Sequence, residues 1–160
     1  MSDFRPSGFS VLPTVVKNLL IINVLFFLAT IACDMVLRID LADYLGLHYI
    51  GASDFQPYQL VTYMFMHGNF AHLFFNMFAL WMFGNTLENI WGANRFLLFY
   101  FVCGIGAGLV QELVQYIQYA TTLQGYENVR IAANQIIPMS QYLNLLTTVG
   151  ASGAVFGILL

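Results

Sequence analysis

The sequence contains very little charge. Only 8% of its 160 residues are Asp, Glu, Lys or Arg, whereas soluble domains carry about 25%. None of these four residue types occurs from residue 55 to residue 87, and a helix that crosses a bilayer needs about 20 mostly apolar residues. The scarcity of charge therefore excludes an ordinary soluble domain and predicts a polytopic membrane protein.

The sequence is also poor in basic residues and in cysteine. Five Lys and Arg are outnumbered by eight Asp and Glu, which gives a net charge of −3 with no basic run, so we expect no nucleic-acid partner. The two cysteines, Cys33 and Cys103, lie in apolar stretches and belong to no CxxC or Cys/His cluster. We expect both to be buried small hydrophobes, with no redox or metal-binding role.

Apolar runs are abundant, and hydrophobic residues make up 59% of the chain. Hydropathy places candidate spans at residues 15–37, 70–87, 95–119 and 150–160. The last would reach only about 16 Å as a helix, roughly half of a ~30 Å hydrocarbon core, so we expect the chain to stop inside the membrane. The predicted fold is an all-α membrane bundle, with a cytoplasmic tail (residues 1–14) before the membrane domain (residues 15–160).

The segments between these spans differ in polarity. Residues 38–66 are amphipathic and rich in aromatic side chains, which is typical of a segment that lies in the membrane interface. The stretch "ATTLQGYENVRIAANQIIPMSQYLN" before the fourth span is the most polar part of the chain. It predicts an exposed loop, with one short helix that ends before Pro138.

The basic residues give a weak signal for orientation. Arg5, Lys17 and Arg95 would share one side of the membrane, and Arg38 and Arg130 the other. Because positive charge gathers on the cytoplasmic side, three against two favours a cytoplasmic N-terminus.

The second span carries two polar residues in "HGNFAHLFFNMFALWMFG". His72 and Asn76 are four residues apart, which places both on one face of a helix. Polar side chains inside a membrane are costly and usually face a bundle interior or a water-filled cavity. They could be interhelical hydrogen-bonding residues or part of a reactive site. His67 lies about one turn before His72, and we expect it to have a structural or interfacial role.

The fourth span begins "GASGAVFG", in which Ser152 stands between small residues. The flanking glycines let another backbone or a substrate approach closely. A helix start also offers free N–H groups that suit a developing oxyanion. The alternative is a packing face, because Gly153 and Gly157 form a GxxxG, as Gly104 and Gly108 do in the third span.

Taken together, the two motifs favour a catalytic site over a surface that serves only helix packing. A nucleophile on one helix, with hydrogen-bond donors for an oxyanion on another, is the arrangement that acyl transfer inside a membrane requires. A channel or transporter would instead predict paired, discontinuous spans, and the chain contains no internal repeat.

At this level of detail the sequence resembles the rhomboid family of intramembrane serine proteases. The resemblance covers about residues 57–160 and rests on "HGNFAHLFFN", "GNTLENIWG", the GxxxG of the third span and "GASGAVFG". It implies a six-helix core, of which four spans would be present here, and an active site below the membrane surface that opens to water on the non-cytoplasmic side. It also implies that residues 38–66 form a half-submerged first loop.

The resemblance further implies a role for each motif residue. Ser152 would be the nucleophile, and its amide would line an oxyanion hole with His72 and Asn76. Gly150 and Ala151 would shape the approach of the substrate, and Gly153 would serve both approach and helix packing. Phe156 would pack against a catalytic histidine, and Glu88 would cap or tie the loop between the second and third spans. Gly104, Gly108 and Gly157 would be structural.

Two features depart from the family pattern. Tyr58 and Gln59 stand where many members carry Trp-Arg, a pair whose arginine locks the first loop. The family's general base is a histidine on the sixth span, and His48, His67 and His72 cannot replace it. Because a serine hydroxyl without a base is a poor nucleophile, we expect this stretch alone to be inactive.

The resemblance implies a complete protein that cleaves transmembrane segments of other membrane proteins without metal or organic cofactor. It would lie in a bacterial inner membrane as a multi-pass protein. The alternative is an inactive rhomboid-like protein that binds or escorts membrane proteins.

Overall fold

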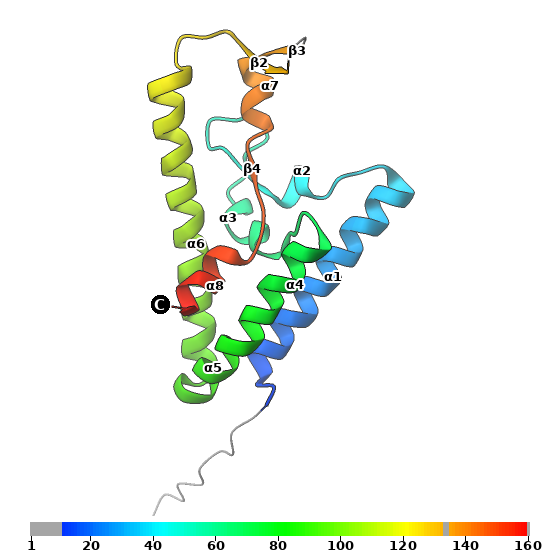
Figure 1. Ribbon diagram of the computed structural model, residues 1–160, viewed down its shortest axis with the longest axis vertical. Helices are drawn as coiled ribbons and strands as arrows, with labels where there is room; N and C mark the ends of the chain where they lie inside the picture. The colour runs from blue at the N-terminus through cyan, green and yellow to red at the C-terminus, as the bar shows by residue number, and fades with distance from the viewer. Residues whose placement is uncertain (1–10, 133–134, 160) are drawn as a thin grey trace, which may run out of the picture.

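The computed structural model describes residues 11–132 and 135–159. Within these residues the chain is mostly helical, with four short strands that the all-α prediction did not include (Figure 1). The predicted N-terminal tail falls largely outside the described residues.

Two described helices are long and apolar enough to cross a membrane. They are α1 (Thr14–Leu37) and α6 (Ala93–Gln118), which a π-helical turn, η3 (Tyr119–Leu123), extends. Both agree closely with the predicted spans 15–37 and 95–119. Most apolar side chains of α1 are exposed, and its buried residues are Val16, Leu19 and Asn23. Such a surface suits contact with lipid rather than water.

The other two predicted spans coincide with shorter helical segments. Residues 70–91 form one helical run, in which α4 (Phe70–Ala79) passes through the π-helical η2 (Leu80–Gly84) into α5 (Asn85–Trp91). The run ends at Gly92, whose φ of 83° favours glycine. The last helix, α8 (Ser152–Leu159), begins at the predicted serine. That these two segments cross the membrane stays a prediction.

The segment expected at the interface folds into short elements against the bundle. It contains α2 (Ala42–Leu45), β1 (Leu47–His48), α3 (Gln59–Thr62) and the 3-10 turn η1 (Tyr63–Phe65). Strand β1 pairs antiparallel with β4 (Thr147–Thr148), with Leu47 opposite Thr148 and His48 opposite Thr147. This pairing fastens the first loop to the residues just ahead of α8.

The polar stretch before α8 is more ordered than a plain loop. Strands β2 (Asn128–Ala132) and β3 (Gln135–Pro138) form a hairpin at the far end of α6, and α7 (Met139–Asn144) follows (Figure 1). The predicted short helix was therefore placed on the wrong side of Pro138. Proline lacks the N–H that a helix interior needs, but it is tolerated at a helix start, and here it precedes the first residue of α7.

The buried core joins elements that are far apart in sequence. It contains Val16 and Leu19 of α1, Leu47 of β1 and Tyr63 and Met64 of η1, together with residues of α4, α6 and α8. Helix α8 crosses α6 in Figure 1 and packs against it. The core thus holds the start of α8 in place against both the first loop and α4.

Candidate active site

Ser152 is the first residue of α8, and the residue two before it sets the local geometry. Gly150 has a φ of 123°, a conformation that strains any residue with a side chain. Its N–H donates to the Tyr63 carbonyl at 2.9 Å. This bond fastens the residues just before α8 to the first loop. Ser152 itself is half-buried, and its hydroxyl lies beside the Gly150 turn.

Gly150 is also the point where the two predicted motifs meet. A Cβ on Gly150 would lie 2.6 Å from Nε2 of His72 and 3.8 Å from Oγ of Ser152. The imidazole and the hydroxyl therefore face the same small space, although 80 residues separate them in sequence. Any side chain at position 150 would fill that space.

Asn76 lies on the same face of α4 as His72 and is buried. Its Nδ2 donates to the His72 carbonyl at 3.0 Å. An amide NH2 group carries two donor hydrogens, so one remains for another acceptor. The start of α4 is fixed by Asn69, whose Oδ1 accepts the His72 N–H at 2.8 Å and thereby caps the helix.

The two GxxxG pairs serve different contacts. On α8, a Cβ at Gly153 would collide with Ala107, and one at Gly157 would lie 2.5 Å from Cβ of Cys103, so both glycines let α8 approach α6 closely. On α6, Gly104 and Gly108 instead face the first loop. A side chain at either would meet Met64 or Tyr63, respectively.

Four further residues bear on the sequence-based predictions. Ala151 is fully buried, whereas Phe156 is 67% exposed; the roles predicted for both stay predictions. The cysteines are half-buried rather than buried, because Cys103 packs on Gly157 at the helix surface and Cys33 lies near the end of α1.

Glu88 has a different partner from the one predicted. Its two carboxylate oxygens accept the backbone N–H groups of Val15 at 2.9 Å and Val16 at 2.8 Å. The predicted tie was to the loop between the second and third spans. Glu88 instead caps the N-terminus of α1, where Pro13 provides no side-chain cap and a negative charge is favourable.

The first loop is held by a residue that stands where the family pattern has arginine. Gln59 is 1% exposed. Its Oε1 accepts from the backbone N–H groups of His48 and Gln56, and its Nε2 donates to the carbonyls of Tyr44 and Asp54. The loop therefore keeps a lock of neutral hydrogen bonds without the arginine.

Two other residues that sequence reasoning did not identify fasten the loop to α6. The hydroxyl of Tyr63 donates to the Gly104 carbonyl at 2.6 Å, and Oε2 of Glu112 accepts the Ile50 N–H at 2.7 Å. Glu112 is a buried acid in a long apolar helix. Because an ionisable side chain is costly inside a membrane, its position in the sequence could have identified it as a residue with a specific partner. Tyr63 carries no such signal.

Comparison with known proteins identifies the family to which the chain belongs. A model of the Rhomboid domain matches residues 54–160. The chain belongs to the rhomboid family. The rhomboid protease AarA of Providencia stuartii is 34% identical over 95 residues, which cover 59% of this chain and 29% of that protein. Rhomboid-like protein 11, chloroplastic, of Arabidopsis thaliana is 35% identical over 101 residues, 63% of this chain and 26% of that protein.

A shorter match concerns the rhomboid protease GluP of Bacillus subtilis (strain 168), which is 44% identical over 48 residues, 30% of this chain and 10% of that protein. Across these three rhomboid relatives, the chain spans between about a tenth and about three tenths of their length. Family membership and the two long apolar helices together establish an integral membrane protein of mostly helical structure.

Proposed function

We propose that the complete protein is an intramembrane serine endopeptidase that cleaves transmembrane segments of other membrane proteins. The observation that carries this proposal is the convergence of the His72 imidazole and the Ser152 hydroxyl on Gly150. Six membrane spans, four of them in this chain, and an N-terminus in the cytoplasm of a bacterial cell are part of the same proposal.

In the proposed mechanism, Oγ of Ser152 attacks the scissile carbonyl carbon. The charge that forms on the carbonyl oxygen is stabilised by the Ser152 N–H at the start of α8, the His72 ring and the free N–H of Asn76. Such oxyanion contacts contribute about 3–4 kcal/mol each to transition-state stabilisation. A histidine beyond Leu160 would take the hydroxyl proton and pass it to the leaving amine, after which water hydrolyses the acyl-enzyme.

The substrate must unwind before this attack can occur, because a peptide bond inside a helix is shielded by its hydrogen bonds. Small or helix-breaking residues near the membrane surface would lower that cost. Substrates are therefore expected to be membrane proteins whose spanning segment contains such residues.

The test of the nucleophile uses the full-length protein in liposomes and a fluorophosphonate probe. Wild type should be labelled and Ser152→Ala should not. Equal labelling of both would refute the serine nucleophile.

A second test separates catalysis from packing. His72→Ala and Asn76→Ala should lower turnover about 100-fold or more, with much smaller losses of thermal stability. If stability and turnover fall in parallel, the two residues are interhelical contacts. The alternative function, binding or escort of membrane proteins, predicts that substrates co-purify uncleaved with wild type as they do with Ser152→Ala.

A further inference from the structure

A groove runs along the outer side of α6, close to the point where that helix begins. Its volume is about 400 Å³, and the residues that line it are Trp91, Arg95, Leu98, Phe99 and Val102. The rings of Trp91, the last residue of α5, and Phe99 meet edge to face, with centroids 5.1 Å apart and planes at 87°. Trp91 therefore forms one wall of the hollow, which we call the α5–α6 groove.

The groove occupies a face of α6 that, apart from Trp91, no described element covers. Leu98 and Val102 are 67% and 60% exposed. Helix α8 packs instead at Cys103 and Ala107, and the first loop packs on the GxxxG pair of α6. Because the chain belongs to a membrane protein and α6 is long and apolar enough to cross a bilayer, an exposed apolar face of α6 borders lipid.

A polar hollow continues the groove at the start of α6. Its volume is about 480 Å³, and the residues that line it are Trp91, Gly92, Ala93, Asn94 and Arg95. Trp91 and Arg95 belong to both hollows, and the apolar part of the groove lies one to two turns further along the helix. A phospholipid has the same order of polarity, with its headgroup at the membrane surface and its acyl chains beneath it.

The charge at this end of the bundle favours an anion. In residues 11–20 and 84–98 the charged side chains are Lys17, Glu88 and Arg95. Glu88 is buried and binds the N-terminus of α1, whereas Lys17 and Arg95 are exposed. Arg95 forms no hydrogen bond or ion pair with any described residue. A guanidinium can bind two phosphate oxygens at once, and tryptophan is typical of the membrane–water interface.

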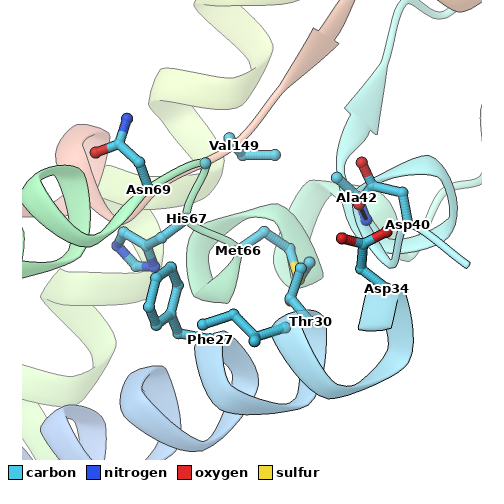
Figure 2. A pocket seen from close by; sticks show the side chains of 11 residues that line it. Phe27, Thr30, Asp34, Asp40, Ala42, Met66, His67, Asn69 and Val149 are labelled. Carbon is cyan, nitrogen blue, oxygen red and sulfur yellow. Dashed lines mark hydrogen bonds between the residues drawn. The ribbon is translucent and has the colours of Figure 1, made fainter. Parts of the chain in front are cut away.

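The hollow at the other end of α1 has the opposite charge. It measures about 280 Å³ and lies between α1 and the loop before α4. Figure 2 shows the carboxylates of Asp34 and Asp40 at one end of it. These carboxylates would repel an anionic headgroup, so charge directs such a ligand to the α5–α6 groove.

We propose that the α5–α6 groove binds an anionic phospholipid of the leaflet in which α6 begins. Its phosphate lies in the polar hollow against Arg95, and one acyl chain lies along Leu98, Phe99 and Val102. A lipid bound in this way contacts both α5 and α6 and holds the two helices together at the membrane surface. This inference does not depend on the proposed proteolytic function, because lipid binding is measured without a substrate.

The first experiment measures the affinity of the full-length protein in detergent for phosphatidylglycerol and for phosphatidylcholine by native mass spectrometry. Wild type should bind phosphatidylglycerol more tightly. Arg95→Gln should lower that affinity about fivefold, the contribution that one basic residue near the surface makes to binding anionic lipid. Lys17→Gln is the matched control, since it removes an exposed positive charge at the same end but outside the groove, and it should have no effect. Equal affinity of wild type for the two lipids, or equal results for the two variants, overturns the inference.

A second experiment separates a lipid site from a simple phosphate site. Leu98→Ala should weaken phosphatidylglycerol binding several-fold, because it removes apolar surface that the acyl chain covers. Leu109→Ala removes the same atoms from a 53% exposed position of α6 outside the groove and should have no effect. Glycerol phosphate, which has no acyl chain, should not compete with phosphatidylglycerol. Competition by glycerol phosphate, or equal affinities of the two leucine variants, would contradict a bound lipid.

Discussion

His48 and His67, which precede and follow η1 in the sequence, are both buried but differ in their hydrogen-bond partners. His48 is 2% exposed and His67 is 3% exposed. In His48, Nδ1 lies 3.0 Å from the Asn144 carbonyl and Nε2 lies 2.9 Å from the Asp43 carbonyl. In His67, both nitrogens are without a partner among the described residues.

The difference distinguishes a region that holds the fold together from the region of the candidate active site. His48 belongs to a network in which the first loop, β4 and α7 satisfy one another, and such a network holds a fold in one conformation. His67 lies next to His72, which contacts the Gly150 turn, and its ring nitrogens have no hydrogen-bond partner among the described residues. Buried polar groups without a partner in a native structure often have a functional explanation. The predictions below test each region in turn.

The largest effect is expected at the turn that contains Gly150. Gly150→Ala adds a methyl group 2.6 Å from Nε2 of His72 and strains a backbone with φ of 123°. Turnover should fall at least about 100-fold, as when an oxyanion donor is lost. Gly125→Ala is the matched control, because Gly125 has a φ of 94° and no atom within 4 Å of its Cβ position. Similar losses of activity in both variants would mean that strain alone, and not the contact with His72, is responsible.

The next effect concerns the satisfied network. Gln59→Leu keeps the volume of the side chain but removes the partner of two N–H groups and of the Asp54 carbonyl, while the Tyr44 carbonyl keeps only the Tyr58 hydroxyl. We expect the free energy of unfolding to fall by about 3 kcal/mol, measured by thermal denaturation in detergent. Gln56→Leu, at an exposed position of the same loop, should cost less than about 0.5 kcal/mol. If the two variants unfold alike, Gln59 does not lock the loop.

A smaller effect is expected at the opposite end of the bundle. Glu88→Gln keeps one acceptor oxygen for the N-terminus of α1 but removes the negative charge. Hydrogen bonds to charged groups contribute about 1.5–3 kcal/mol, so a loss of about 1 kcal/mol is expected for Gln and about 2 kcal/mol for Glu88→Ala. Turnover per folded molecule should stay at the wild-type level, because Glu88 binds α1 rather than the site. A loss of turnover in folded Glu88→Gln would place this residue in the machinery of the reaction.

The sequence predicted the parts of this molecule that depend on composition and local spacing. The long helices followed from apolar length, and the shared face of His72 and Asn76 followed from a spacing of four residues. The beginning of α8 at Ser152 agreed with the glycine-framed motif. These features require only neighbours along the chain, so a single sequence carries them.

What the sequence did not predict depends on contacts between distant segments. The β1–β4 pairing, the Glu88 cap on α1 and the four bonds of Gln59 join residues whose relation no local pattern encodes. The short helix near Pro138 was misplaced because proline can end one element and begin another. The departure from Trp-Arg at Tyr58 and Gln59 suggested a missing lock, whereas glutamine supplies four neutral bonds in its place.

An effect of similar size to that at Glu88 is a pH dependence that arises from His67. Burial and the neighbouring His72 lower the pKa of His67 to about 4 in the fold, against about 6.5 in an unfolded chain. The unfolded state therefore binds the extra proton as pH falls from about 6.5 towards 4, and native stability falls across that window. Between pH 7 and pH 5 the loss attributable to His67 should be about 1–2 kcal/mol.

Thermal denaturation of wild type and His67→Phe at both pH values isolates this contribution. The variant has no group to titrate at position 67, so its decline in stability between pH 7 and pH 5 should be smaller by that amount. Titratable groups that do not contact His67 remain in both proteins, and their contributions cancel in the difference. An equal decline in wild type and variant would show that His67 titrates normally, and that water or another partner already satisfies its charged form in the fold.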